Sequence, residues 1–242
     1  MQIQICRGFT DIQWKELRKR LAQNGAAGYD EDAWRCAVEV FERRIRERFL
    51  SCIEALQRDD AKSDITVNDG APADCPTLPK DDGRDVVVPG FAIMALCCLL
   101  IETLQSFRES RRTPSQVTEP CNYPKGDCIR PQASTTDAFK KFLQLPAFKG
   151  EFVNDNVAKR FVRGVRNGIL HEAETRRWVI WREEPKGRII EPEARGYAVN
   201  RTAFYKAVKT EFNNYLRELL DPGKTALRSR FLKKMNDIAK EC

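Results

Sequence analysis

The sequence predicts a mainly α-helical fold, an antiparallel helical bundle with a small β-hairpin late in the chain. Apolar residues recur every three or four positions along most of the chain, as they do on the buried face of a helix. Residues 86–101 carry no charge, which indicates one helix buried on nearly all sides. The apolar spacing then changes at Trp178-Val-Ile-Trp181, a pattern typical of a short strand.

The composition is that of a globular chain. The protein has 242 residues, of which 42% are hydrophobic and 32% are charged. A chain of this length buries a substantial core without needing a disulfide or a metal. The composition excludes collagen, long low-complexity chains and multi-span membrane proteins.

The first half of the chain is expected to hold two amphipathic helices and an acidic loop. A short helix is predicted over 11–21, within an N-terminal extension of residues 1–28. A long helix is predicted over 29–57, with apolar positions from Trp34 to Leu56 in steps of three or four. Residues 59–85 contain eight Asp and three Pro, which predicts a flexible acidic loop.

The charge-free run is the centre of the next predicted helix, over 89–111. It is sixteen residues long, short of the roughly 20 that span a bilayer. Pro89 suits the start of a helix. We therefore expect a core helix here and no membrane association.

The second half of the chain is expected to alternate helices and loops. A proline-rich loop over 112–133 leads into a short helix to Leu145. Asn154 or Asp155 caps a helix that ends near Glu174. A β-hairpin is predicted over 176–199, with short strands at 178–181, 188–190 and 197–199. A helix over 203–220 follows, and residues 221–242 form a basic C-terminal helix.

Positive charge is concentrated in the last 92 residues. Residues 151–242 hold 20 Lys and Arg against 13 Asp and Glu, a surplus of seven that equals the net charge of the whole chain. Such a basic region suits a polyanion such as RNA. A solvated basic face is the other interpretation, and the charge count does not decide between them.

The cysteine and histidine counts limit metal chemistry. The chain has nine Cys, without a CxxC pair, and a single His. A site needing two or more His ligands from one chain is excluded, and a four-ligand zinc site is disfavoured. We expect no metal and no cofactor. Reduced thiols and the lack of a signal-like N-terminus predict a cytoplasmic protein.

The most informative segment is Arg163-Gly-Val-Arg-Asn-Gly-Ile-Leu-His171. On a helix, Asn167 and His171 are one turn apart and share a face, with Arg163 on the same stripe. Gly164 and Gly168 remove bulk beside that stripe. Two such glycines predict that another helix or a ligand approaches closely.

This segment resembles the signature of the HEPN superfamily, an Arg followed by a polar residue and then a His. Arg166, Asn167 and His171 fill that pattern, with four residues between Arg and His. HEPN domains are helical bundles with this motif on a late helix. The resemblance covers roughly residues 30–220, so residues 29–220 are expected to form a HEPN-like domain.

The resemblance implies a metal-independent endoribonuclease that forms a 2′,3′-cyclic phosphate, as a toxin or anti-phage defence effector. RNA, an antitoxin or another regulatory protein, and a second copy of the chain are the implied partners. The homodimer would share a composite active site. The expected catalytic residues are Arg166, Asn167 and His171, supported by Glu102 and Arg163, with Arg160, Arg176 and Arg177 binding RNA.

Each of these residues also has a structural interpretation. A lone helical histidine is commonly structural, and Glu102 could be a core carboxylate paired with an Arg. Trp178 and Trp181 could stack on bases, although packing of the hairpin onto the helices is favoured. For the whole protein, the alternatives are a non-catalytic HEPN module that binds a nucleotide, RNA or a partner, and an oligomeric protein whose acidic loop covers the basic face.

Overall fold

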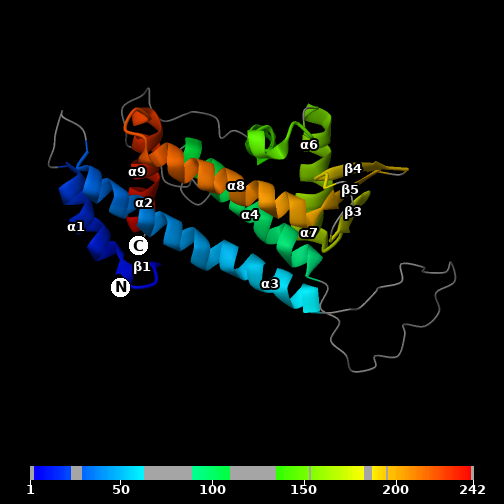
Figure 1. Cartoon of the computed structure of the whole chain (residues 1–242), viewed down its shortest axis with the longest axis horizontal. Coiled ribbons are helices and arrows are strands. Elements are labelled where there is room, and N and C mark those ends of the chain that lie inside the picture. The colour runs from blue at the N-terminus through cyan, green and yellow to red at the C-terminus, as the bar shows by residue number, and fades with distance from the viewer. Residues whose placement is uncertain are drawn as a thin grey trace, which may run out of the picture.

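The structure is a computed structural model that describes residues 3–22, 29–62, 89–109, 135–152, 154–182, 187–194 and 196–240. Within them the fold is mainly helical, as the sequence predicts (Figure 1). The helices are α1 (Asp11–Ala22), α2 (Glu31–Ile45), α3 (Ser51–Lys62), α4 (Gly90–Glu109), α5 (Thr135–Leu143), α6 (Asp155–Phe161), α7 (Asn167–Glu172), α8 (Arg201–Leu220) and α9 (Thr225–Lys240). The described residues also form two π-helical turns, η2 (Arg46–Leu50) and η5 (Val162–Arg166), and the 3₁₀ turn η4 (Pro146–Phe148).

The predicted long helix is one continuous rod from Glu31 to Lys62, made of α2, η2 and α3. Asp30 caps it, because its carboxylate accepts from the backbone N–H groups of Asp32 and Ala33, both at 3.0 Å. The rod continues beyond the predicted end at residue 57. Residues 59–62 of the expected acidic loop are therefore helical, and residues 63–85 lie outside the described residues.

The rod, α4 and α8 form the centre of the bundle (Figure 1). The rod runs antiparallel to α8, since its Trp34 end contacts Leu219 and its Glu54 end contacts Tyr205. In contrast, α4 runs parallel to α8, because the end of α4 is tied by an ion pair to the end of α8. There, Arg108 Nη1 donates to Glu218 Oε2 at 2.7 Å. The bundle is thus antiparallel only in part.

Helix α4 is the core helix that its charge-free run predicts. Ten of its residues are buried, and they pack against the rod, α5, α8 and α9. By length and composition it is also the one helix of the described residues that could cross a membrane. More than half of its apolar window is buried inside the protein, as in the core helix of a soluble fold. The proline-rich segment 112–133 that follows it lies outside the described residues.

The late β unit is a three-stranded sheet, and its pairing differs from the predicted hairpin. Its strands are β3 (Trp178–Trp181), β4 (Ile190–Glu193) and β5 (Gly196–Asn200). The hairpin is formed by β4 and β5, while β3 pairs parallel to β5 on its other edge. Gly196 permits this arrangement, because a Cβ there would lie 1.9 Å from the carbonyl oxygen of Arg177.

The two terminal segments pack on the same end of the bundle. A small sheet of β1 (Gln4–Cys6) and β2 (Phe9–Thr10), which the sequence did not predict, precedes α1. Trp14 of α1 is buried and donates from Nε1 to Asn236 Oδ1 of α9 at 2.9 Å. Phe231 and Met235 of α9 belong to the hydrophobic core.

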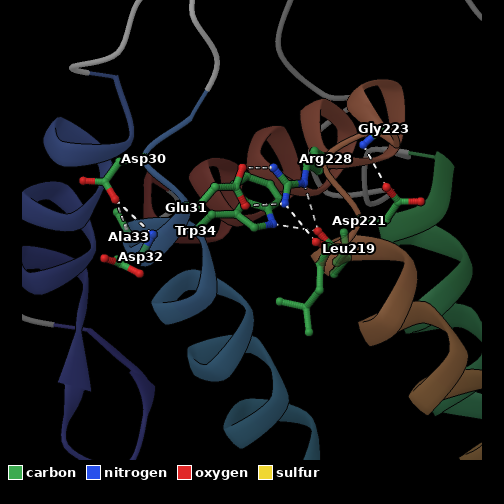
Figure 2. A network of polar contacts seen from close by, with 10 residues as sticks. Asp30, Glu31, Asp32, Ala33, Trp34, Leu219, Asp221, Gly223 and Arg228 are labelled. Carbon is green, nitrogen blue, oxygen red and sulfur yellow. Dashed lines mark hydrogen bonds and ion pairs between the residues drawn. The ribbon is translucent and has the colours of Figure 1, made fainter.

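A buried arginine ties α9 to the two long helices (Figure 2). The guanidinium of Arg228 donates from Nη1 and Nη2 to the carboxylate of Glu31, at 2.6 and 2.9 Å. It also donates to the carbonyl oxygens of Leu219 and Leu220, which end α8. Its Cζ atom lies 4.6 Å from the ring centre of Trp34. We call these contacts the Arg228 clasp.

Candidate functional site

The predicted motif lies on one helix, formed by α6, η5 and α7. Asn154 caps its start, since its side chain accepts from the N–H of Asn156 at 2.8 Å. The helix ends at Ala173, whose φ of 53° is left-handed. A regular helix was predicted, but residues 162–166 form a π-helical turn. Such turns occur frequently at functional sites, and this one ends at Arg166.

Arg166 contacts both of the polar residues that were predicted to accompany it. Its Nε donates to Glu102 Oε1 on α4 at 2.7 Å, and its Nη1 donates to Asn167 Oδ1 at 3.0 Å. The side chains of Arg166 and Glu102 are 18% and 30% exposed. This charge-assisted pair fixes the guanidinium at the surface of the bundle without removing it from solvent. Glu102 is therefore a carboxylate paired with an Arg, and it is also part of the candidate site.

The thiol of Cys98 lies beneath this pair on α4. Burial raises the pKa of Cys98, the Glu102 carboxylate raises it further, and the Arg166 guanidinium opposes both effects. The thiol therefore stays protonated at neutral pH and is not a nucleophile for this site.

His171 lies in the last turn of α7 and is exposed. No hydrogen bond or ion pair joins its imidazole to any residue that the structure describes. A structural histidine is normally held by a partner, whereas this ring is open to a ligand. Arg166 faces α4 while His171 is exposed at the helix end, in keeping with the angle of about 140° that five residues of α-helix impose.

The predicted RNA-binding arginines differ in how much of their charge is free. Arg160 is exposed, and its guanidinium lies 6.0 Å from the ring centre of Tyr197. Arg163, predicted as a supporting residue, is exposed on the same helix. Arg176 instead forms a two-point ion pair with Glu172, which offsets its charge. Arg177 is exposed at a left-handed φ of 58°.

The two glycines of the motif accommodate the protein's own chain, which corrects the expectation of another helix or a ligand. A Cβ at Gly164 would lie 2.5 Å from Trp178 Cδ1 and 2.7 Å from the carbonyl oxygen of Arg176. A Cβ at Gly168 would lie 2.3 Å from the carbonyl oxygen of Glu174. The loop after α7 folds back over the helix, so the glycines do not provide a surface for a second subunit.

Trp178 has the packing role that the sequence favoured. It is 5% exposed, stacks on Tyr197 with ring centres 5.0 Å apart, and meets Phe161 edge to face. It anchors the sheet on the motif helix and is not available to RNA bases. Trp181 is half-buried at the end of β3.

The described residues contain no group of three His, Cys, Asp or Glu side chains placed to hold a metal ion. Five of the nine cysteines fall within them, and all five are free thiols. The side chains of the candidate site are a guanidinium, a carboxylate, an amide and an imidazole.

The geometry thus gathers Glu102, Arg166 and Asn167 into one hydrogen-bonded group and leaves His171 exposed on the same helix. The sequence did not predict the π-helical turn or the fold-back of the loop, although Gly164 and Gly168 signalled a close approach.

Comparison with known proteins identifies no relative: no family model, no curated protein and no solved structure matches this chain.

Proposed function

We propose that this protein is a metal-independent endoribonuclease of the HEPN type. The observation that carries the proposal is the held guanidinium of Arg166 on the same helix as an exposed His171 that has no partner among the described residues. A guanidinium can bind phosphate oxygens, and an imidazole can act as a general base or acid. Cleavage of an RNA phosphodiester needs both properties.

The reaction begins when a base removes the proton of a 2′-hydroxyl group. The 2′-oxygen attacks the adjacent phosphorus, the bond from phosphorus to the 5′-oxygen breaks, and an acid protonates that 5′-oxygen. The products are a 2′,3′-cyclic phosphate and a 5′-hydroxyl. The imidazole of His171 is the proton carrier in this proposal.

Arg166 stabilises the negative charge that develops on the phosphate oxygens. Two of the five N–H groups of its guanidinium are committed, one to Glu102 and one to Asn167. The remaining N–H groups can donate to the non-bridging oxygens. Glu102 and Asn167 act as positioning residues, because they hold the donor in place before the charge forms.

One histidine cannot act as base and acid at the same moment. We propose a homodimer whose composite site brings His171 of each copy, or His171 of one copy and Arg166 of the other, to a single phosphate. Because its own loop covers Gly164 and Gly168, the dimer would be formed by other surfaces of the motif helix.

The decisive experiment is incubation of the purified protein with labelled single-stranded RNA in EDTA, followed by analysis of the product ends. We expect cleavage that leaves 2′,3′-cyclic phosphates, or the 3′-phosphates formed from them. His171→Ala and Arg166→Ala should each reduce the rate about 100-fold or more. Arg18→Ala, an exposed arginine of α1, is the matched control and should cleave like the wild type.

Cleavage that appears only with Mg²⁺ or Mn²⁺ and leaves 5′-phosphates would exclude this mechanism. In cells, the proposal of a cytoplasmic toxin or defence effector predicts that induced expression arrests growth and that His171→Ala relieves the arrest. A regulatory protein or antitoxin would then be sought as the partner that prevents arrest.

A non-catalytic RNA- or nucleotide-binding module is the second candidate. The observation that favours it is the exposure of Arg160 and Arg177, which can bind phosphates without taking part in any cleavage. The same assay separates the two. A binding module retains RNA in a filter-binding measurement and gives no cleavage products, and His171→Ala leaves its affinity unchanged.

A further inference from the structure

A second cluster of polar side chains lies where α3 meets the first half of α8. Glu54 Oε1 accepts from the hydroxyl of Tyr205 at 2.8 Å and from Lys209 Nζ at 2.7 Å. These residues line a cavity of about 460 Å³, together with Gln57, Arg58, Thr202 and Lys206. The cluster contains no residue of the motif helix, and it has no part in the proposed cleavage.

The side chains that line this cavity offer more hydrogen-bond donors than acceptors. The side-chain nitrogen Nε2 of Gln57 is buried and has no hydrogen-bond partner among the described residues. Arg58 and Lys206 are exposed, and no partner of either side chain is found among the described residues. Glu54 is the single carboxylate of the lining, and Lys209 already pairs with it. Three cations against one carboxylate leave a surplus of two positive charges.

An adjoining cavity of about 570 Å³ has a different character. Thr202 and Lys206 line both cavities, so the two hollows meet on one face of α8. Aliphatic and polar side chains share the rest of the lining of the larger one. The aliphatic residues are Pro146, Ala147, Ile189, Ala203 and Ala207, and the polar ones are Lys149, Asn200 and Thr210. A charged hollow therefore continues into a partly aliphatic one.

We propose that these two cavities form a binding site for an organic phosphate monoester. The phosphate would accept from Gln57, Arg58 and Lys206, and the organic part would lie on the aliphatic surface of the larger cavity. A phosphate monoester carries about 1.5 to 2 negative charges at pH 7, which matches the surplus of the lining. A ligand with one carboxylate brings only one negative charge, so it would leave one of the two unpaired cations without a counter-charge.

The test is isothermal titration calorimetry of the full chain with three probes. Adenosine 5′-monophosphate contains both a phosphate group and a larger organic body, inorganic phosphate has only the first, and adenosine has only the second. We expect adenosine 5′-monophosphate to bind at least about tenfold more tightly than either of the other probes. Equal affinity for adenosine and its monophosphate would overturn the proposal.

Variants locate the binding. Arg58→Ala and Lys206→Ala should each weaken binding of adenosine 5′-monophosphate about tenfold. Arg18→Ala and Lys224→Ala, which remove exposed cations elsewhere, should leave it unchanged. His171→Ala should also leave it unchanged, which separates this site from the cleavage site. Binding that survives Arg58→Ala and Lys206→Ala, or that is lost with His171→Ala, would contradict the assignment.

Discussion

At the scale of single residues, the proposed mechanism depends most on the contact between Glu102 and Arg166. The motif alone places a guanidinium near the end of a helix. The carboxylate of α4 determines where that guanidinium is held and which of its N–H groups remain for a ligand. The proposed mechanism therefore depends on Glu102 as a positioning residue that need not touch the RNA.

This role predicts a graded series at Glu102. Glu102→Ala frees the guanidinium and should lower kcat about 10- to 100-fold with little change in KM, because a misplaced donor stabilises the transition state poorly. Glu102→Gln keeps an acceptor oxygen and should restore most of kcat. Steady-state cleavage of labelled RNA measures both constants. Equal losses in the two variants, or losses that follow thermal stability alone, would rule out a positioning role.

Gly164 and Gly168 are constrained by packing, because neither position has room for a side chain. We predict that Gly164→Ala and Gly168→Ala each lower the free energy of unfolding by about 1–3 kcal/mol, since the new methyl group meets a tryptophan ring or a backbone carbonyl. Urea denaturation followed by circular dichroism measures the change. Gly90→Ala is the control, because its Cβ would meet nothing closer than 3.4 Å. If both variants were as stable as the wild type, the loop after α7 could not lie against Gly164 and Gly168 as described.

At the scale of secondary-structure elements, the Arg228 clasp holds the end of α8, the start of α9 and the start of α2 together (Figure 2). The hydrogen bond from Arg228 lowers the pKa of Glu31 below its usual value. A carboxyl whose pKa is lowered by folding adds stability above its unfolded pKa, and this contribution is lost as the pH falls through the folded pKa.

We therefore predict a pH-dependent effect of Glu31→Gln. Above about pH 5 the variant should be less stable than the wild type by about 1 kcal/mol, a modest value because the Glu31 side chain is 43% exposed. The difference should shrink as the pH falls below about 4. Urea unfolding at several pH values measures it. Lys19→Ala breaks an exposed pair with Glu16 on α1 and should have no measurable effect. A difference that stays constant down to pH 3 would contradict the assignment.

At the scale of the whole molecule, the composite site predicts complementation between inactive variants. Arg166→Ala and His171→Ala proteins are mixed under conditions that exchange subunits. Each heterodimer keeps one Arg166 and one His171 on different chains, so partial cleavage should return. Native mass spectrometry confirms the exchange. If exchange occurs and cleavage remains at the level of the single variants, the two groups do not act across the dimer.

Periodicity and capping residues predicted the helices well. The long rod and the core helix follow from short-range patterns, because the burial of a face repeats every 3.6 residues whatever the face packs against. The cap at Asn154, one of the two predicted positions, is also a local feature. The strand order could not be predicted in the same way. Whether β3 pairs with β4 or with β5 depends on where the chain returns, and Gly196 permits the approach that decides it.

The sequence by itself determined the helical class, the central position of α4 and the place of Arg166, Asn167 and His171 on one late helix. The tertiary structure alone decided that Glu102 holds Arg166, that the loop of the chain covers the two glycines, and that α3 and α8 line an open basic cavity. The reason is physical. Local patterns fix which face of a helix is buried, whereas a contact between residues 64 positions apart depends on the angle and register at which two helices pack.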